Sequence, residues 1–180
     1  MHKLILISGS AAAGKTSLAN VLSEKLNLPY FSKDQIKESL FDSLGWSDKE
    51  WSQKLGMAAI KLLYVIAESE MSAGRVFIIE SNFKDKIDTV QIEQLSRKYG
   101  YQVLEFHCFA RMEMLIARFK ERVVTNRRHP GHVDHLFSES YFDPTVFKPM
   151  TLGAIKVDTS DFAKLDYSEL VNKARIFLEI

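Results

Sequence analysis

Residues 9–16 read Gly-Ser-Ala-Ala-Ala-Gly-Lys-Thr, a spacing that predicts a phosphate-binding loop (P-loop). In such a loop, backbone N–H groups surround phosphate oxygens, the lysine reaches the β- and γ-phosphates, and the final hydroxyl binds Mg²⁺. We therefore predict that Lys15 contacts the phosphates of ATP and that Thr16 binds Mg²⁺. The residues predicted to bind the nucleotide in this segment are Gly9, Ser10, Ala11, Ala12, Ala13, Gly14, Lys15, Thr16 and Ser17.

Three further residues could act on a phosphoryl acceptor. Asp34 follows the strand-like stretch 30–32, and its carboxylate could accept the proton of a substrate hydroxyl, orient that hydroxyl, or help to hold Mg²⁺. Its alternative role is to cap the helix that follows. Lys37 is either a contact for an anionic substrate or a solvated helix charge. Glu80 directly follows the apolar run 76–79, at the end of a predicted strand. An acid in this position could order Mg²⁺ or water, and the alternative is that Glu80 is only a polar strand terminus.

An arginine-rich segment follows later in the chain. Arg118 and Arg122 lie one helical turn apart, and planar guanidinium groups can neutralise the charge of a transferred phosphoryl group. We predict that they reach the ATP phosphates from a closing lid, the alternative being surface ion pairs with glutamates of the same helix. Arg127 and Arg128 would extend the lid or bind an acidic substrate. A zinc site at the histidines of residues 129–135 is disfavoured, because Pro130-Gly131 interrupts their spacing and no cysteine is near.

The elements that must position these residues alternate between strands and helices. This alternation predicts an α/β fold with a parallel sheet. Ser47 with Glu50 predicts a capping box at the start of a long helix. The predicted strands are 4–7, 30–32, 76–79, 102–109 and 154–157, and the predicted helices are 15 to near 27–29, 47–73, 85–99, 112–124 and 166–178.

Composition narrows the class of protein. The length of 180 residues and a hydrophobic share of 46% suffice for one core, which predicts a single domain. With 24 Lys and Arg against 23 Asp and Glu, no overall basic field attracts nucleic acid or membranes. Cys108 is the only cysteine, and the first residues are too short an apolar run for a signal peptide or a membrane span. We expect a cytoplasmic protein with no obligate protein partner.

Other nucleotide-driven classes fit less well than a kinase. The Asp-x-x-Gly pattern of residues 42–45 follows a helical stretch, and the Asn-Lys-x-Asp motif of guanine recognition is absent from the sequence. A large mechanical ATPase needs a longer chain. Phosphotransfer to a small molecule therefore fits best.

Several motifs together resemble the adenylate-kinase-like P-loop kinase superfamily. They are the P-loop, the Ser-Lys-Asp step of residues 32–34, the strand 77–80, the Arg118-x-x-x-Arg122 pair and the segment 127–132. The chain is similar to the small AAA-type ATPase or kinase members, near the zeta-toxin, chloramphenicol phosphotransferase and polynucleotide 5′-hydroxyl kinase branches.

This resemblance implies a three-layer P-loop NTPase fold, with a parallel five-stranded sheet flanked by helices, and a requirement for ATP and Mg²⁺. It implies one domain over residues 1–180, with a helical substrate-side insertion at about 40–74 and an arginine-rich lid at about 118–135. Asp34 matches the carboxylate that handles the substrate hydroxyl, and Thr159 and Ser160 fall where adenine is held. The P-loop differs from the common form in its three alanines, so we expect ordinary backbone angles there.

The leading hypothesis is an ATP-dependent kinase that transfers the γ-phosphoryl group to a hydroxyl of a small molecule. Its predicted catalytic residues are Lys15, Asp34, Arg118 and Arg122, its substrate-binding residues are Asp34, Lys37, Glu80, Arg127 and Arg128, and its metal ligands are Thr16 and Asp34. One alternative is a nucleotide or polynucleotide 5′-hydroxyl kinase, which leaves a nucleic-acid acceptor open but not favoured. The other is an ATP-binding regulatory module with little phosphotransfer.

Overall fold

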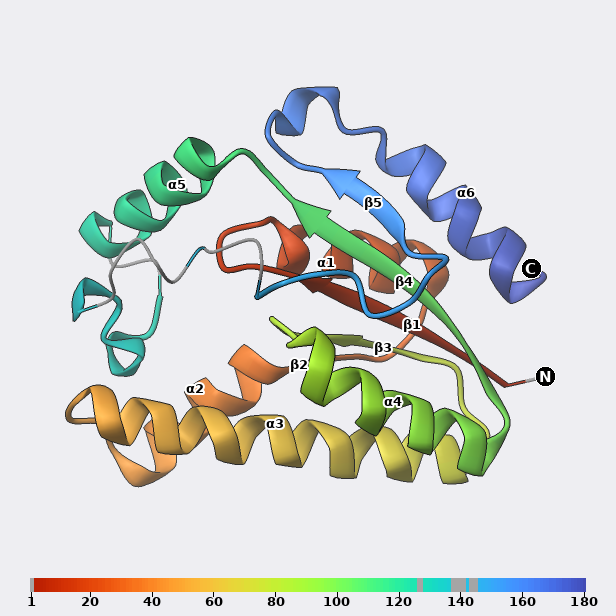
Figure 1. The fold of residues 1–180 in the computed structure, drawn as a ribbon, viewed down its shortest axis with the longest axis horizontal. Helices are drawn as coiled ribbons and strands as arrows, with labels where there is room; N and C mark the ends of the chain where they lie inside the picture. The colour runs from red at the N-terminus through yellow and green to blue at the C-terminus, as the bar shows by residue number, and fades with distance from the viewer. Residues whose placement is uncertain (1, 126–127, 137–141, 143–145) are drawn as a thin grey trace.

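The computed structural model of the chain describes residues 2–125, 128–136, 142 and 146–180 (Figure 1). Five parallel strands form one sheet in the order β2-β3-β1-β4-β5, which confirms the predicted five-stranded α/β fold. The strands are β1 (His2–Gly9), β2 (Tyr30–Ser32), β3 (Phe77–Glu80), β4 (Tyr101–Phe109) and β5 (Ile155–Asp158). The α-helices are α1 (Lys15–Leu26), α2 (Lys33–Leu44), α3 (Lys49–Ser72), α4 (Asp85–Tyr99), α5 (Met112–Val124) and α6 (Tyr167–Leu178).

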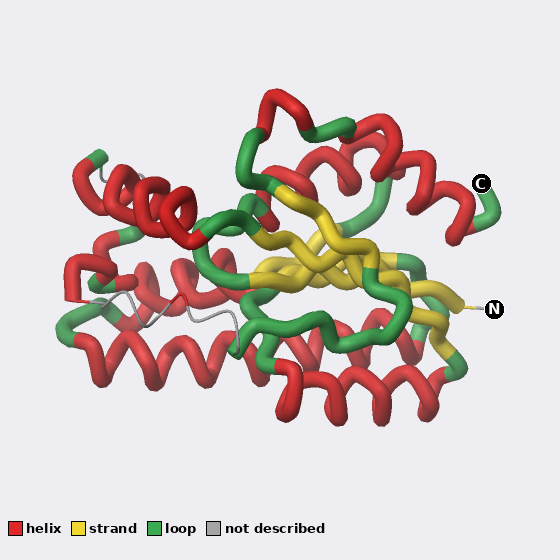
Figure 2. Tube along the Cα trace, turned by 45° about the horizontal axis from the view of Figure 1, so that its top comes forward, coloured by secondary structure: helices red, strands yellow, loops and turns green. Residues whose placement is uncertain are grey.

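Helices cover both faces of the sheet (Figure 2). Successive side chains of β1 point to opposite faces, and residues 4–7 are fully buried. Leu4 and Leu6 pack in the cluster that includes residues of α3 and α4, whereas Ile5 and Ile7 pack in the cluster that includes residues of α1 and α6. Burial on both faces explains why the central strand reads as a continuous apolar run instead of an alternating one.

The helical region between β2 and β3 differs in detail from the prediction. It consists of two helices, α2 and α3, and it begins directly after β2 at Lys33. The long helix α3 begins at Lys49, two residues later than predicted, because Asp48 is its N-cap and accepts a hydrogen bond of 2.8 Å from the Trp51 N–H. The capping box predicted at Ser47 is therefore wrong. Among the described residues, none of the helices is both long and apolar enough to cross a membrane.

The end of β1 requires a glycine. Gly9 has a φ of 131°, and a Cβ at this position would lie 2.0 Å from the carbonyl oxygen of Cys108 on the neighbouring strand β4. We expect Gly9→Ala to lower the free energy of unfolding by at least about 3 kcal/mol, because the clash is with main chain that cannot move without breaking the sheet. Denaturant unfolding measures this. Gly153→Ala is the control, since its Cβ would meet nothing within 4 Å, and equal midpoints for the two variants would contradict the expectation.

Candidate active site

Most of the predicted site residues line one cavity at the carboxyl ends of the strands, where open α/β sheets bind ligands. The P-loop follows β1, Asp34 follows β2, and Glu80 ends β3, so three neighbouring strands deliver these groups to one edge. The lining residues are Ala11, Ala12, Ala13, Gly14, Lys15, Thr16, Asp34, Glu80, Ser81, Asn82, Arg122 and Arg128.

The Lys15 ammonium group is held by the P-loop itself. It donates a 2.7 Å hydrogen bond to the carbonyl oxygen of Ser10 and lies 4.0 Å from a carboxylate oxygen of Glu80. Burial lowers the pKa of Lys15, although the negative charge of Glu80 opposes this shift. Helix α1 begins at Lys15, and Gly14 at its N-cap provides no side-chain hydrogen bond. The positive end of the helix dipole therefore adds to the lysine charge at the cavity.

The backbone of the P-loop is less ordinary than expected. Ala12 has a φ of 59°, so the prediction of ordinary backbone angles at the alanines is wrong at this residue. A left-handed angle costs an alanine about 1 kcal/mol, which packing must offset, and the Ala12 side chain is buried in the core. Gly14 has a φ of 78°, and a Cβ there would lie 2.8 Å from the Phe162 ring.

Glu80 is buried and accepts hydrogen bonds from three hydroxyl groups. Ser32 and Tyr30 donate to its Oε2 at 2.9 and 2.8 Å, and Thr16 donates to the same oxygen at 3.4 Å. Burial and the nearby Glu80 charge raise the pKa of Tyr30, so the phenol keeps the proton that it donates. Tyr30 and Ser32 are not among the residues predicted for the site. Their spacing is a signal that could have identified them, because two hydroxyl residues at alternate positions of a short strand lie on the same face.

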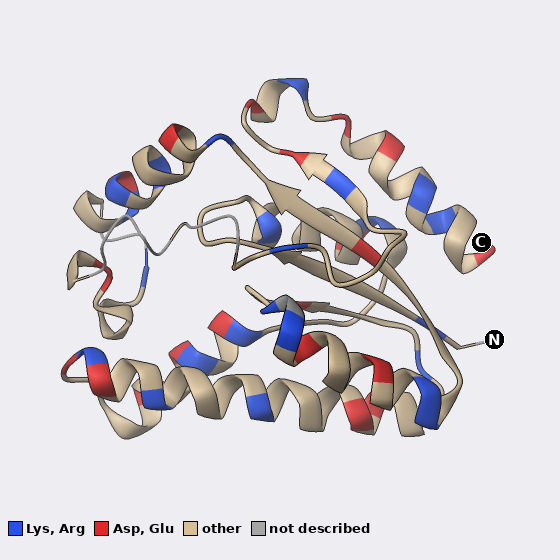
Figure 3. Ribbon diagram, viewed as in Figure 1, with Lys and Arg blue, Asp and Glu red and all other residues tan. Residues whose placement is uncertain are grey.

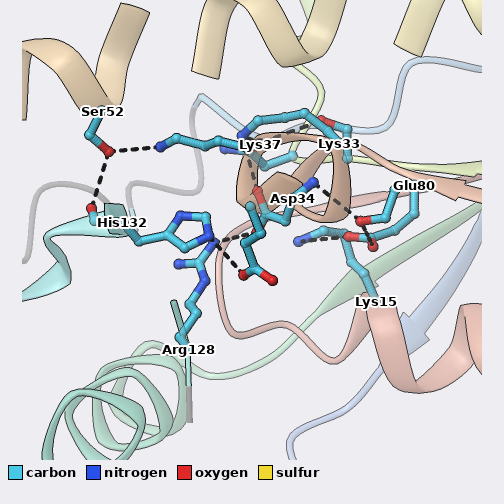
Figure 4. Close-up of polar contacts among 12 residues, drawn as sticks. Lys15, Lys33, Asp34, Lys37, Ser52, Glu80, Arg128 and His132 are labelled. Atoms are coloured by element: carbon cyan, nitrogen blue, oxygen red, sulfur yellow. Dashed lines mark hydrogen bonds and ion pairs between the residues drawn. The ribbon is translucent and has the colours of Figure 1, made fainter. Parts of the chain in front are cut away.

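The carboxylate of Asp34 is free of the helix-capping role, because Ser32 is the N-cap of α2 and accepts from the Asp34 N–H. The capping alternative for Asp34 is therefore wrong. Arg128 donates a hydrogen bond to the Asp34 carboxylate, and the Lys33 ammonium lies 3.3 Å from it (Figure 4). Burial raises the pKa of Asp34, but the positive charges of Arg128 and Lys33 outweigh burial and hold this pKa well below its usual range. The side chain is thus an anion that faces cations.

Lys37 lies one turn further along α2 and is also buried. Its Nζ donates a 2.9 Å hydrogen bond to the Ser52 hydroxyl of α3 and lies 5.1 Å from the centre of the Phe41 ring (Figure 4). Burial, with a contribution from the like charge of Lys33, lowers the pKa of Lys37 to about 8. A solvated helix charge, the alternative left open above, is therefore wrong.

A buried charge of this kind costs folding stability. The pKa of Lys37 is about 8 in the fold against an ordinary value of 10.5, so the cost is fully present below pH 8 and disappears as the pH rises towards 10.5. We expect Lys37→Met to raise the free energy of unfolding at pH 7 by roughly 1–2 kcal/mol, with the gain lost near pH 10.5. Thermal unfolding across this pH range measures it. The control Lys61→Met removes an exposed lysine from α3, and a gain that does not depend on pH would contradict the explanation.

The structure separates the arginines that the sequence pairs. Arg122 lines the cavity together with Arg128. Arg118 is not among the residues that line this cavity, and it donates to the carbonyl oxygens of Thr159 and Ser160 at 2.5 and 3.3 Å. Its guanidinium carbon lies 4.1 Å from the centre of the Phe162 ring, which itself is close to Gly14. Arg118 thus contacts the two residues that were predicted to hold adenine. Arg127 lies outside the described residues.

The segment after α5 packs on α2 through two histidines. His129 lies 3.2 Å from an Asp42 carboxylate oxygen and His132 lies 2.9 Å from one of Glu38, and both rings contact Phe41. The described residues contain no group of three or more His, Cys, Asp or Glu side chains that could hold a metal ion. His129 and His132 each have a separate acidic partner.

The donor set at the cavity nonetheless suits Mg²⁺. The Thr16 hydroxyl, the Glu80 carboxylate and the Asp34 carboxylate all supply oxygen atoms, which this hard cation prefers. Mg²⁺ usually takes few protein ligands and keeps waters or binds substrate phosphates. A site with so few acids is therefore chemically adequate for it.

Comparison with known proteins agrees with this geometry. Residues 4–136 match the family described as AAA domain. The structure of a protein from Chloroflexus aurantiacus described as a candidate kinase is 35% identical, with a TM-score of 0.88 and 97% of each chain covered. No curated protein matches the sequence.

Two more distant structures share the fold. The APS kinase of Mycobacterium tuberculosis, solved with AMPPNP and APS, is 14% identical with a TM-score of 0.68, covering 99% of this chain and 98% of its own. A sugar kinase from Janibacter is 13% identical with a TM-score of 0.62, covering 100% of this chain and 96% of its own.

Proposed function

Since the chain belongs to the AAA domain family and has the fold of the P-loop small-molecule kinases, we propose that it is an ATP-dependent kinase. It transfers the γ-phosphoryl group of ATP to a hydroxyl of a small molecule. The observation that carries this proposal is the cavity that is lined by the P-loop and Asp34 together with Arg122 and Arg128. Such a cavity joins a phosphate donor site to an acceptor carboxylate.

The donor half would act by position and charge. The P-loop amides and Lys15 hold the phosphates, and Arg122 neutralises charge that develops on the transferred group. Mg²⁺, held through Thr16 and the acids beside it, would supply further neutralisation when bound. Thr159 and Ser160, with Arg118 against them, would hold the adenine. A bound AMPPNP molecule in one of the fold relatives, an APS kinase, supports this assignment.

The acceptor half is built on α2. Because its pKa is held low, the Asp34 carboxylate is a weak base, and we assign to it the orientation of the acceptor hydroxyl. This suffices for a loose transition state, in which the hydroxyl proton leaves late. The acceptor hydroxyl would replace Arg128 as the hydrogen-bond partner of Asp34. The acceptor-side insertion is then α2 with α3, and residues 118–135 form the lid of one domain.

A nucleotide acceptor is the second candidate. Arg128 and Lys33 both contact the Asp34 carboxylate, and two cations beside the acceptor carboxylate suit an acceptor that carries a phosphate or carboxylate group. A long nucleic-acid strand is less suitable, since acidic and basic residues are mixed along the described helices (Figure 3). A polynucleotide would also need a basic track to bind its backbone.

The direct test is ADP formation from ATP in the presence of candidate acceptors. The set should include sugars, hydroxyl antibiotics, nucleosides, nucleotides and oligonucleotides with a 5′-hydroxyl, with product mass measured for each compound that raises the rate. We expect one class to stimulate ADP formation and to gain one phosphoryl group. Tight ATP binding without stimulation by any class would favour the regulatory module over the kinase.

A further inference from the structure

One buried carboxylate has all of its close hydrogen bonds on one oxygen. Glu80 Oε2 accepts from Tyr30 at 2.8 Å, from Ser32 at 2.9 Å and from Thr16 at 3.4 Å. The other oxygen, Oε1, lies 4.0 Å from the Lys15 ammonium group. The two oxygens therefore have different surroundings, and this difference fixes which of them faces the P-loop lysine (Figure 4).

The pairing of β2 with β3 creates this arrangement. Ser32 is the register partner of Glu80 on the adjacent parallel strand, so the two side chains leave the sheet at the same level. Tyr30 lies two residues earlier on β2 and therefore on the same face, and its longer side chain spans the remaining distance. Ser32 also accepts from the N–H of Asp34, which connects Glu80 to the start of the helix that carries the acceptor carboxylate.

We propose that Tyr30 and Ser32 are positioning residues, which hold the Glu80 carboxylate with its Oε2 towards Thr16 and its Oε1 towards Lys15, so that Oε2 stays on the side where Mg²⁺ would bind. The inference rests on the proposed function, because it assumes that ATP and Mg²⁺ bind at this loop. Without the two hydroxyl donors, a buried carboxylate would turn towards Lys15 to regain hydrogen bonds. That turn would bind the lysine to Glu80 and remove an oxygen from the metal side of the site.

The test is the affinity of AMPPNP for Tyr30→Phe, measured by titration once with Mg²⁺ and once with EDTA. We expect the affinity to be about 10-fold weaker than that of wild type with Mg²⁺ and unchanged in EDTA. A loss of about 10-fold is typical when a residue that hydrogen-bonds to a metal ligand is removed. Tyr101→Phe is the matched control. It also removes a phenol hydroxyl that donates a hydrogen bond, here 2.7 Å long to the Arg75 carbonyl oxygen, but at the far end of β4.

A second variant and a double variant distinguish positioning from general destabilisation. Ser32→Gly removes the donor to Glu80 while glycine remains an acceptable N-cap, so the same Mg²⁺-specific loss is expected. In a Glu80→Gln background, Tyr30→Phe should have little further effect, since the residue acts through Glu80. An equal loss with Mg²⁺ and with EDTA, or undiminished effects in the Glu80→Gln background, would overturn the proposal.

Failure of the proposed function is a separate outcome. If wild type binds AMPPNP more tightly with Mg²⁺ but phosphorylates no acceptor, the kinase assignment fails and the positioning role stands. If Mg²⁺ does not change the affinity of wild type at all, the positioning role is refuted whatever acceptor is found.

Discussion

Lys15→Ala is expected to lower ATP-dependent phosphotransfer by about 1,000-fold, the loss typical when a preorganised charge is removed from the transition state. The ammonium group is buried and already fixed on the Ser10 carbonyl oxygen at 2.7 Å, so little reorganisation is needed before phosphate binds. Its charge acts in a cavity with restricted water, where electrostatic interactions are stronger than at the surface. Initial rates of ADP and product formation measure the loss.

The fold should survive this substitution. Glu80 loses Lys15 as a neighbour but keeps the hydroxyl donors Tyr30 and Ser32, so the buried carboxylate is not left without hydrogen bonds. Lys25→Ala is the matched control, because Lys25 lies in the last turn of the same helix and is exposed. Undiminished ATP binding and turnover in Lys15→Ala would refute the assignment of residues 9–16 as the phosphate site.

The central part of the fold could be predicted because its signals are local. The apolar run before the P-loop, the helical spacing after Lys15 and the glycine at residue 100 each depend on neighbours in the chain. The structure has β1, α1 and α4 at these places, and α4 ends at Gly100 in a left-handed conformation. The start of α3 is harder to predict, because Ser47 and Asp48 are adjacent and either side chain can cap a helix.

The direction of a side chain depends on tertiary contacts that spacing does not contain. Arg118 and Arg122 are one turn apart on α5, yet Arg118 lies over the Phe162 ring and donates to the Thr159 carbonyl oxygen, whereas Arg122 lines the cavity. Similarly, the pairing of Asp34 with Arg128 joins residues 94 positions apart. Ala12 is the opposite case, since a local rule on alanine backbone angles was overridden by the shape that the loop must take.

Asp34→Asn is expected to lower kcat/KM for the acceptor by at least about 100-fold while ATP affinity changes by no more than a few fold. The amide has the shape of the carboxylate but no charge, so it is a poorer acceptor for the substrate hydroxyl. The rest of the site should persist, because both cations have a second partner. Arg128 also contacts Asp134 at 3.0 Å, and Lys33 also donates a hydrogen bond of 3.1 Å to Asn82. Phosphotransfer rates at varied acceptor concentration, with AMPPNP affinity alongside, measure both quantities.

Asp42→Asn is the control for this experiment, since Asp42 lies on the same helix and also faces the segment after α5, through His129 at 3.2 Å. If both variants lose activity equally, the effect arises from the contact between α2 and that segment and not from the acceptor hydroxyl. If Asp34→Asn weakens AMPPNP binding as strongly as it slows transfer, Asp34 belongs to the donor side with Thr16. Full phosphotransfer by Asp34→Asn would remove Asp34 from the mechanism, and the acceptor hydroxyl would then have to be oriented by the cations around it.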